Sequence, residues 1–581
     1  MKFKIKRVLT VAERKRLEGF SPLVAHLLFH RGITDANSAK KYLEPNYDDG
    51  THDPFLFKDA EKAAGRIIKA IQNNEKIAIY ADYDADGIPG AAIFHDFFKK
   101  IGFSNFMTYI PHRHDEGFGV NQEAVRELVG NGVNLLITVD CGITDIVPIS
   151  LAKKLGLDVI ITDHHEPPAQ LPEAFAIVDH KQIGCEYPDK NICGAGTAYK
   201  LIQAVLKKNR FGLKEGQEKW FLDMVGIATL SDMVPLTGEN RVFARYGLTV
   251  LRKSPRKGLM CLLNKLKIPQ KHITEDDIAF MITPRINAAS RMGVPMDAFR
   301  LLTAENDNDA YIYVEHLDKI NNERKGVVAS LVKEVKKTVH ERHGTNIPSV
   351  IVLGNPAWRP ALLGLAANSC AEEFKRPVFL WGRDGDDVIK GSCRSGGASN
   401  VVELMRAVPG KVFSQFGGHR HSGGFAVFNE SIHYLEQRLN EAAEKIEVKK
   451  NRQTSETDRE ANPDLDSGMV DTELSLDDIG HNLFNDINRL SPFGVGNAKP
   501  VFLFRDVVIR DIRTFGKANE HIELTFHKTN GTKVSAVSFF GVANDWANVI
   551  KPSQSVDLAA SIERSMFRGR SEIRLRIIDV C

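Results

Sequence analysis

Short apolar runs alternate with helix-like stretches between residues 76 and 165. The runs at 77–81, 135–139 and 159–162 contain few polar residues, and a polar cluster follows each of them. Strands that are apolar on both faces and separated by helices are typical of a parallel sheet covered on both sides. The pattern therefore predicts an α/β domain, which we place at residues 76–304.

The flanking sequence on both sides of this domain is helical in character. Residues 1–75 predict a helical lead-in that packs on the α/β domain, with one helix starting at Ser21-Pro22 and an amphipathic helix over 59–71. Residues 305–343 carry many charges and few helix breakers, so they predict one long connecting helix.

A smaller α/β domain is expected over residues 344–446. Apolar runs occur at 350–353 and 377–381, and a glycine-rich stretch follows at 391–424. Strand-like runs with intervening helical sequence again favour a mixed α/β fold.

The C-terminal part of the chain changes texture once more. Residues 447–480 are mostly polar and indicate a linker. Residues 481–581 alternate apolar and polar positions, which predicts a small antiparallel β-barrel. Its strands are expected at 501–504, 507–509, 521–526 and 573–577.

The composition is that of a globular protein, with 43% hydrophobic and 26% charged residues in a chain of 581. No apolar run approaches the ~18 residues of a membrane-spanning helix, and the basic N-terminus leads into charged sequence. The seven cysteines are widely spaced and form no C-x-x-C pair. We therefore expect a cytoplasmic protein without a disulfide framework, a structural zinc site or a membrane partner.

Three predicted strands end in residues that suit metal ions. These are Asp82, Asp84 and Asp86, then Asp140, then Asp163, His164 and His165. Because ligands bind beyond the carboxyl ends of parallel strands, all of them are expected at one edge of the sheet. The acids would repel one another without a cation. Asp oxygens with imidazole nitrogens suit Mn²⁺ or Mg²⁺, and two such ions activate water in phosphoester hydrolysis. Asp232, after an apolar helix, is expected to complete the site.

Two other interpretations of these acids are weaker. The D-x-D-x-D-G run resembles a calcium loop, but the twelfth position counted from Asp82 is Ile93 instead of Glu. Each acid alone is a plausible helix N-cap. That all of them cap helices after three successive strands is improbable.

The motifs resemble those of the DHH phosphoesterase superfamily and, within it, the RecJ exonucleases. The similarity runs through nearly the whole chain. The metal motifs are matched by D-Y-D-A-D-G (82–87), V-D-C-G (139–142), D-H-H (163–165) and S-D-M-V-P-L (231–236). The second half carries P-R-I-N-A-A-S-R-M-G (284–293), W-R-P (358–360), G-S-C-R-S (391–395), F-G-G-H-R-H-S-G-G (416–424) and P-F-G-V-G-N (492–497). The resemblance implies a DHH domain, a DHH-associated domain and a C-terminal OB-fold.

The resemblance also implies roles for individual residues. The implied metal ligands, which are also the catalytic residues, are Asp82, Asp84, Asp86, Asp140, His164 and Asp232. His165 is expected to contact the scissile phosphate or to support a ligand. The implied substrate contacts are Arg113, Ser392 and Arg394 for a 5′-phosphate, and Arg285, Asn287, Arg291 and His419 along the cleft. Structural salt bridges remain an alternative for Arg285 and Arg291.

The predicted OB-fold suits single-stranded nucleic acid, because OB-folds combine a basic groove with aromatic stacking. Most of its phenylalanines are expected in the barrel core. The run 567–570, which includes Arg568, is expected to form an exposed hairpin that contacts DNA.

The function implied by the resemblance is a single-stranded-DNA-specific exonuclease that works from 5′ to 3′ and releases mononucleotides with two divalent cations, Mn²⁺ or Mg²⁺. Its setting would be recombination and mismatch repair, as a monomer, with a single-strand-binding protein and a helicase as partners. Two alternatives stay open. One is a phosphoesterase of short oligonucleotides or cyclic dinucleotides, and the other is a replication scaffold without catalysis. The net charge of +3 gives no sign of nucleic acid by itself, since acids at the site offset basic residues elsewhere.

Overall fold

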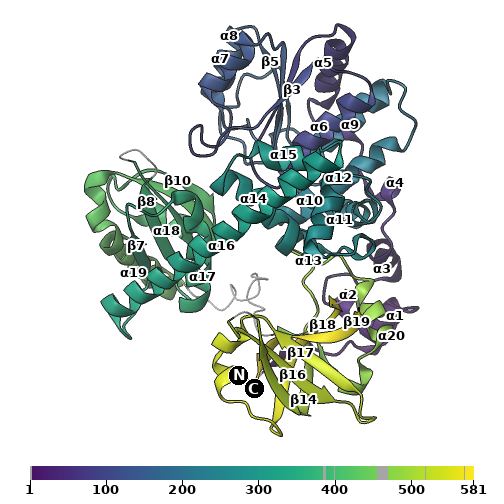
Figure 1. Cartoon of the computed structure of the whole chain (residues 1–581), viewed down its shortest axis with the longest axis vertical. Coiled ribbons are helices and arrows are strands. Elements are labelled where there is room, and N and C mark those ends of the chain that lie inside the picture. Colours follow the sequence, from purple (N-terminus) through teal and green to yellow (C-terminus); the bar gives the residue numbers. More distant parts are fainter. Residues whose placement is uncertain (1–2, 384–387, 398, 454–468, 517, 568–569) are drawn as a thin grey trace.

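The computed structural model describes residues 3–383, 388–397, 399–453, 469–516, 518–567 and 570–581. Figure 1 shows three bodies, an upper one in purple to teal, a left one in green and a lower one in yellow. The helix α16 (Asp307–His343) runs from the upper body to the left one, so the predicted connecting helix is confirmed. Asn306 caps its first turn and Gly344, with φ 56°, ends it.

The upper body is built on a five-stranded sheet in the order β3-β2-β4-β5-β6, with every neighbouring pair parallel. The strands are β2 (Ile77–Ala81), β3 (Phe106–Tyr109), β4 (Leu135–Val139), β5 (Asp158–Thr162) and β6 (Ala176–Val178). The three predicted strands are confirmed. The sequence did not reveal β3, which is half-exposed, or β6, which has three residues.

Alternate residues of these strands enter two different cores. Ile77 and Ile79 pack with α5 (Ala60–Gln72), α6 (Gly87–Lys100) and α9 (Gly194–Lys208). Ala78 and Tyr80 pack with α7 (Gln122–Gly130) and α8 (Ile146–Lys154) on the other face. The sheet is therefore covered on both sides, which explains its continuous apolar strands.

Further helices extend the first of these cores. They are α4 (Tyr47–Gly50), α10 (Leu222–Ser231), α11 (Gly238–Leu251), α12 (Lys257–Leu266), α13 (Glu275–Asp277), α14 (Thr283–Met292) and α15 (Met296–Leu302). The first half of α16 packs on α12 and α14.

The N-terminal lead-in is divided between two bodies, which corrects the expectation that all of it packs on the α/β domain. The helices α1 (Val11–Arg16), α2 (Pro22–Phe29) and α3 (Ala36–Leu43) flank or join the apolar core of the C-terminal domain. The strand β1 (Lys4–Ile5) pairs with β12 (Met469–Val470). Of the lead-in residues that the structure describes, those from Tyr47 to α5 join the apolar core of the upper body. An apolar helix face predicts that the helix is buried, but it does not predict which domain the helix packs against.

The left body carries a five-stranded sheet in the order β10-β11-β9-β8-β7. Its strands are β7 (Ile351–Gly354), β8 (Val378–Arg383), β9 (Ile389–Arg394), β10 (Phe413–His419) and β11 (Ser422–Val427). Its helices are α17 (Pro360–Phe374), α18 (Val401–Ala407) and α19 (Leu435–Gln453). The first two strands are parallel and match the predicted runs, whereas the glycine-rich stretch forms the antiparallel strands β9 to β11.

The lower body is a seven-stranded mixed sheet, and α20 (His481–Asn488) lies between its first two strands along the chain. Its strands are β13 (Thr472–Glu473), β14 (Phe502–Val508), β15 (Asp511–Phe515), β16 (His521–His527), β17 (Lys533–Ser538), β18 (Ser555–Phe567) and β19 (Arg570–Val580). The runs predicted at 501–504 and 507–509 belong to one strand that is interrupted by an irregularity in its pairing with β18. Phe502, Phe504 and Phe526 are core residues, as expected.

Across the described ranges, no helix is both long and apolar enough to cross a membrane.

Candidate metal centre and nucleic-acid interface

The polar residues at the strand ends meet where the order of the sheet reverses. The chain leaves β2 for β3 on one side and returns to β4 on the other, which makes a topological switch point. Ala81 of β2 is paired with Val139 of β4, and Val139 is paired with Thr162 of β5. The next residues along the three strands therefore start one row at the carboxyl edge of the sheet, with Asp82, Asp140 and Asp163 side by side.

The loop after β2 is held by hydrogen bonds to its own carboxylates. Asp84 Oδ1 accepts from the backbone N–H groups of Asp86 at 2.7 Å and of Gly87 at 3.2 Å. Asp86 accepts from the N–H groups of Gly194 at 2.6 Å and Ala195 at 2.7 Å, the first residues of α9. A helix N-terminus favours an anion at this place, so α9 positions the Asp86 carboxylate.

Two site residues are held with unusual backbone conformations. Asp140 has φ 62° and Met233, which follows Asp232, has φ 58°. A non-glycine residue in the left-handed region costs about 1 kcal/mol or more and persists where the surrounding structure requires it. Asp140 and Asp232, the neighbour of Met233, belong to the acid edge, which we define as Asp82, Asp84, Asp86, Asp140, His164 and Asp232.

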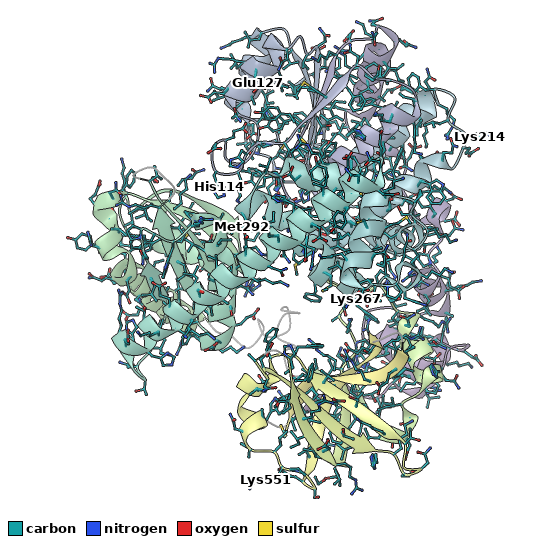
Figure 2. All side chains as sticks on the ribbon, viewed as in Figure 1. His114, Glu127, Lys214, Lys267, Met292 and Lys551 are labelled. Atoms are coloured by element: carbon teal, nitrogen blue, oxygen red, sulfur yellow. The ribbon has the colours of Figure 1, made fainter. Side chains whose placement is uncertain are left out.

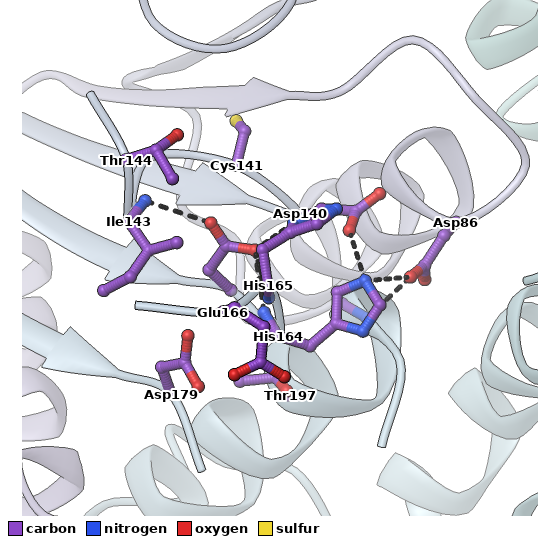
Figure 3. Close-up of polar contacts among 12 residues, drawn as sticks. Asp86, Asp140, Cys141, Ile143, Thr144, His164, His165, Glu166, Asp179 and Thr197 are labelled. Carbon is purple, nitrogen blue, oxygen red and sulfur yellow. Dashed lines mark hydrogen bonds and ion pairs between the residues drawn. The ribbon is translucent and has the colours of Figure 1, made fainter. Parts of the chain in front are cut away.

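His164 is the centre of the acid edge. Its Nε2 lies 3.1 Å from Asp140 Oδ1, 3.7 Å from Asp86 Oδ2 and 3.8 Å from Asp232 Oδ2. Figure 3 shows the imidazole of His164 facing the carboxylates of Asp86 and Asp140. Burial and then the neighbouring His165 lower the pKa of His164 to about 3, so the ring is neutral at physiological pH.

The carboxylates of the acid edge have raised pKa values. Burial, followed by the charge of Asp84, raises the pKa of Asp86 to about 7. Burial, followed by Asp86 and Asp84, raises the pKa of Asp232 to about 9. The pKa values of Asp82 and Asp140 are also raised, again first by burial and then by neighbouring acids. The fold thus places several carboxylates close together without basic side chains that would neutralise their charge.

This donor set fits divalent cations. Asp82 Oδ1 and Asp140 Oδ1 are buried and accept no hydrogen bond from the described residues. Three groups have ligand atoms that lie within 4.8 Å of one another, namely Asp82 with Asp84 and Asp140, Asp86 with His164 and Asp232, and Asp140 with His164 and His165. Carboxylate oxygens with imidazole nitrogen suit Mn²⁺ or Mg²⁺, and adjacent groups that share Asp140 or His164 suit a pair of ions.

Asp163 has a structural part in the site that the sequence interpretation missed. Its carboxylate accepts hydrogen bonds from the backbone N–H groups of Ile143, His164 and His165, and contacts His165 Nδ1 at 2.7 Å. Although burial raises it, the pKa of Asp163 is lowered overall by the hydrogen bond from His165. Burial opposes the charge of His165, but Asp163 raises its pKa to about 9. The position of Asp163 two residues before His165 was the sequence signal from which this contact could have been predicted.

Three predicted arginines lie near one another beside the acid edge. Burial, and then repulsion by Arg113, Arg324 and Arg394, lower the pKa of Arg291 to about 10. Arg291 Nη1 donates to the carbonyl of Ala361 in the left body at 2.6 Å. His114 Nε2 is 3.4 Å from the Arg291 carbonyl oxygen, and Figure 2 shows His114 and Met292 near the boundary of the upper and left bodies. We call Arg113, Arg291 and Arg394 the arginine cluster.

Other predicted substrate contacts have protein partners or lie apart. Arg285 donates from Nε and Nη2 to Asp318 Oδ1 at 3.0 Å and 2.7 Å, which is the structural alternative named above. Asn287 Oδ1 accepts from the Ala85 N–H at 2.9 Å and so supports the loop of acids. Ser392 lies on β9 with Arg394, and His419 is exposed at the end of β10. Arg568 lies outside the described residues.

An exposed aromatic cluster lies on the lower body. The rings of Phe515, His521, Phe539 and Phe540 have centroids 4.8–6.0 Å apart in their contacting pairs. The Arg576 guanidinium lies 4.2 Å from the centroid of Phe539. Phe539 and Phe540 are exposed, so this surface offers both π faces and positive charge.

Known protein families match the three bodies separately. Residues 76–229 match the DHH family, N-terminal domain, residues 348–449 match the DHHA1 domain, and residues 470–579 match the RecJ OB domain.

Individual relatives match between two thirds and all of the chain. The single-stranded-DNA-specific exonuclease RecJ of Bacillus subtilis (strain 168) is 34% identical over 572 residues, which cover 95% of this chain and 70% of that protein. The crystal structure of RecJ in complex with Mn²⁺ from Thermus thermophilus shares the fold, with a TM-score of 0.78 at 24% identity over 100% of this chain and 79% of that one. A crystal structure of exonuclease RecJ bound to manganese has a TM-score of 0.57 at 31% identity, covering 67% of this chain and 95% of that one.

Proposed function

This chain belongs to the RecJ family of single-stranded-DNA-specific exonucleases, and from that membership we propose that it hydrolyses single-stranded DNA from the 5′ end and releases mononucleotides. The observation that carries the proposal is the juxtaposition of an acid edge that fits two divalent cations with an arginine cluster that fits a terminal phosphate. The acid edge would cleave the phosphodiester, and the arginine cluster would select the end at which it is cleaved.

The acid edge has the chemistry for hydrolysis of a phosphodiester. Two bound cations supply activation of a water molecule and neutralisation of charge on the leaving oxygen. Asp82, Asp84, Asp86, Asp140, His164 and Asp232 would hold them. His165, fixed by Asp163, presents its remaining N–H to the scissile phosphate and adds positive charge to that side of the site.

The arginine cluster gives the proposal its polarity. Guanidinium groups bind phosphate through paired N–H donors, and Arg291 and Arg394 are already partly removed from water. A 5′-terminal phosphate held by Arg113 and Arg394, with Ser392 on the same strand as Arg394, would fix the first nucleotide so that the next phosphate lies at the acid edge. Repeated binding of each new 5′ end then releases mononucleotides.

A groove of about 630 Å³ between α16 and α17 offers a path for the rest of the strand. Arg324, Lys325, Lys333 and Lys336 line it together with aliphatic side chains. Arg324 is only 8% exposed, and its Nε has no hydrogen-bond partner among the described residues. A guanidinium with an unpartnered Nε in a groove lined by three lysines favours an anion from outside, which a phosphate backbone provides. The aromatic cluster of the lower body would stack bases further along.

The decisive experiment follows 5′-labelled and 3′-labelled single strands with and without Mn²⁺. We expect early release of the 5′ label as mononucleotide, no attack on duplex DNA, and no reaction with a chelator. Preference for a dinucleotide over a long strand would favour the small-substrate phosphoesterase. An uncut strand in the presence of Mn²⁺ would favour the scaffold without catalysis.

The proposal extends to the setting of the reaction in the cell. We propose a monomer of the cytoplasm that acts in recombination and mismatch repair, where a helicase and a single-strand-binding protein supply and cover its substrate. Sedimentation of the purified protein tests the oligomeric state. Co-purification from cells, with and without nuclease treatment, separates direct protein partners from those that DNA bridges.

A further inference from the structure

Residues 490–499, which include the motif P-F-G-V-G-N, join the lower body to the upper one. Leu490 belongs to the apolar core of the lower body, whereas Leu236, which this segment touches, belongs to the apolar core of the upper body. Gly494 and Asn497 close a tight turn between the two bodies, because each donates its N–H to the carbonyl oxygen of the other, at 3.0 Å and 3.1 Å. We call residues 490–499 the docking segment.

The turn of the docking segment lies directly on the motif that supplies Asp232. The Leu236 N–H donates to the Val495 carbonyl at 2.8 Å. A Cβ on Gly494 would lie 2.8 Å from Leu236 Cδ1, so only glycine lets the two segments approach this closely. Leu236 is 1% exposed and has little room to move aside. A motif of the lower body is therefore in contact with the motif S-D-M-V-P-L (231–236) of the acid edge.

The docking segment is fixed to the upper body at further points. Arg241 of α11 is 3% exposed and donates from Nη2 to the carbonyl oxygens of Leu490 at 3.0 Å and Ser491 at 3.3 Å. The Phe493 N–H donates to Glu275 Oε1 at 3.2 Å, and Glu275 belongs to α13. Figure 1 shows α13 at the lower edge of the upper body. The turn is thus held in place from both sides of its contact with Leu236.

Asp232 depends on its backbone for its position in the acid edge. Asp86 is held by two N–H groups of α9, but the Asp232 carboxylate accepts no hydrogen bond from the residues that the structure describes, and it lies 3.8 Å from His164 Nε2. On one side of Asp232 its own N–H donates to the Ala228 carbonyl, at the end of α10. On the other side, Met233 and the three residues after it lead to the contact with the docking segment. The docking segment therefore limits where this carboxylate lies.

We propose that the docking segment is a positioning element for Asp232, through which the lower body increases the affinity of the acid edge for its cations. The inference rests on the proposed function in one respect, namely that Asp232 holds a cation. Groups that hold a metal ligand in place commonly change metal affinity by about 10- to 100-fold when they are altered. The lower body then has a role in the metal centre besides binding DNA.

The test measures binding of Mn²⁺ alone to the metal-free full-length protein by isothermal titration calorimetry. Gly494→Ala places a methyl group against Leu236 and should raise the Kd for Mn²⁺ about 10-fold. The Mn²⁺ concentration that gives half of the maximal nuclease rate should rise by the same factor. Leu236→Val removes the Cδ1 atom, so the double variant Gly494→Ala with Leu236→Val should recover most of the lost affinity.

A second variant loosens the docking segment without crowding it. Lys499 forms a partly exposed ion pair with Asp276 of α13, and Lys499→Met removes it. We expect the Kd for Mn²⁺ to rise about threefold, on the scale of such an ion pair. Loss of a positive charge would by itself strengthen binding of a cation, so weaker binding would come from the loosened contact.

A matched control separates positioning from general damage to the lower body. Gly480 also belongs to the lower body, but a Cβ there would have no atom within 4 Å, so Gly480→Ala should leave the Kd for Mn²⁺ unchanged. Thermal unfolding in EDTA gives the stability of each variant. If Gly494→Ala lowered the Tm but kept the wild-type Kd, the docking segment would only hold the two bodies together, and the proposal would be overturned.

Failure of the proposal is distinguishable from failure of the proposed function. A wild-type protein that binds no Mn²⁺ would refute the metal centre and with it the proposed function. A wild-type protein that binds Mn²⁺, with Gly494→Ala and Lys499→Met variants that bind it equally well, would refute the positioning role alone.

Discussion

The DHH domain contains two sets of buried carboxylates, one neutralised by basic side chains of the protein and one that is not. Asp223 accepts from Arg256 Nε at 2.7 Å and from Ser254 Oγ at 2.8 Å, and is 2% exposed. Asp82 and Asp140 are as deeply buried, at 5% and 2%. Among the residues that the structure describes, neither of these two forms an ion pair with a lysine or arginine.

This difference separates acids that complete the fold from acids that await a ligand. Arg256 also pairs with Asp96 at 2.6 Å, and although burial raises it, the pKa of Asp96 is lowered overall by this guanidinium. At the acid edge the corresponding pKa values are raised. A folded chain keeps such an unfavourable charge arrangement where it has a function, and here the function is to bind cations.

Among the substitutions that test this difference, the largest effect is expected at Asp140. We expect Asp140→Asn to lower kcat by about 1,000-fold or more, because it removes a ligand that two cation groups share. Binding of single-stranded DNA should persist through the arginines, and stability without metal should not fall, since one repelling charge is gone. Gel-shift, nuclease and urea-denaturation measurements check the three expectations. If binding fell as much as cleavage, the acid would be structural.

Changing Asp223 should have the opposite pattern. Asp223→Asn leaves Arg256 buried with one carboxylate fewer, and the loss of a buried partner costs about 3–5 kcal/mol. The free energy of unfolding, measured with urea, should drop by that amount. The nuclease activity of the protein that remains folded should stay within about threefold of wild type, on the scale where 1.4 kcal/mol is tenfold. A specific loss of activity with normal stability would reverse the assignment of the two sets.

The two sets also differ in how much of them the sequence predicts. Asp82, Asp140 and His164 are predictable, because each follows an apolar strand and parallel strands deliver their ends to one edge. Asp223 and its partner Arg256 are 33 residues apart and lie on no recognisable motif, so only the folded chain brings them together. Arg285 does lie in a recognisable motif, but its partner Asp318 on the connecting helix was not predictable, because only the folded chain brings the two together.

The fold was predictable to a similar extent and for similar reasons. Strands buried on both faces, such as β2 and β4, have a pattern that survives without tertiary information. The half-exposed β3 does not, and neither does the docking of α2 on the C-terminal domain, because burial of an apolar helix does not specify its partner. Asp163 was expected at this edge with the metal-binding residues, but its role of holding His165 was not predictable, because that role depends on hydrogen bonds that only the folded loop forms.

Removal of the metal should make the stability of the protein depend on pH through the carboxylates of the acid edge. The raised pKa values of Asp86, about 7, and Asp232, about 9, mean that the metal-free folded state binds more protons than the unfolded state, whose carboxyl groups have ordinary values. Stability of the metal-free protein should therefore fall as pH rises, by about 4 kcal/mol between pH 6 and 8. Bound Mn²⁺ replaces those protons, so the increase in Tm that it causes should grow with pH.

Thermal unfolding with EDTA or with Mn²⁺ from pH 6 to 8.5 measures this effect. Asp232→Asn removes one of the two titrating groups and should flatten the pH dependence of the metal-free protein. An increase in Tm that is the same at every pH would mean that these carboxylates are ionised before the metal binds.

The smallest effect is expected from the arginines, which repeat the comparison with the opposite charge. Arg285 is neutralised by Asp318. Arg394, by contrast, donates from Nη1 to the carbonyl of Cys393 at 2.8 Å and forms no ion pair with any acid that the structure describes, and burial lowers its pKa. Arg394→Ala should reduce the preference for 5′-phosphorylated over 5′-hydroxyl strands by about 10-fold, the value of one charge-assisted contact to phosphate. Arg285→Ala is the matched control and should lower the Tm while leaving that preference intact. Rates of degradation of the two strand types give the ratio directly.

An unchanged ratio in Arg394→Ala would place the terminal phosphate elsewhere. A changed ratio in Arg285→Ala would mean that its ion pair with Asp318 opens to bind substrate.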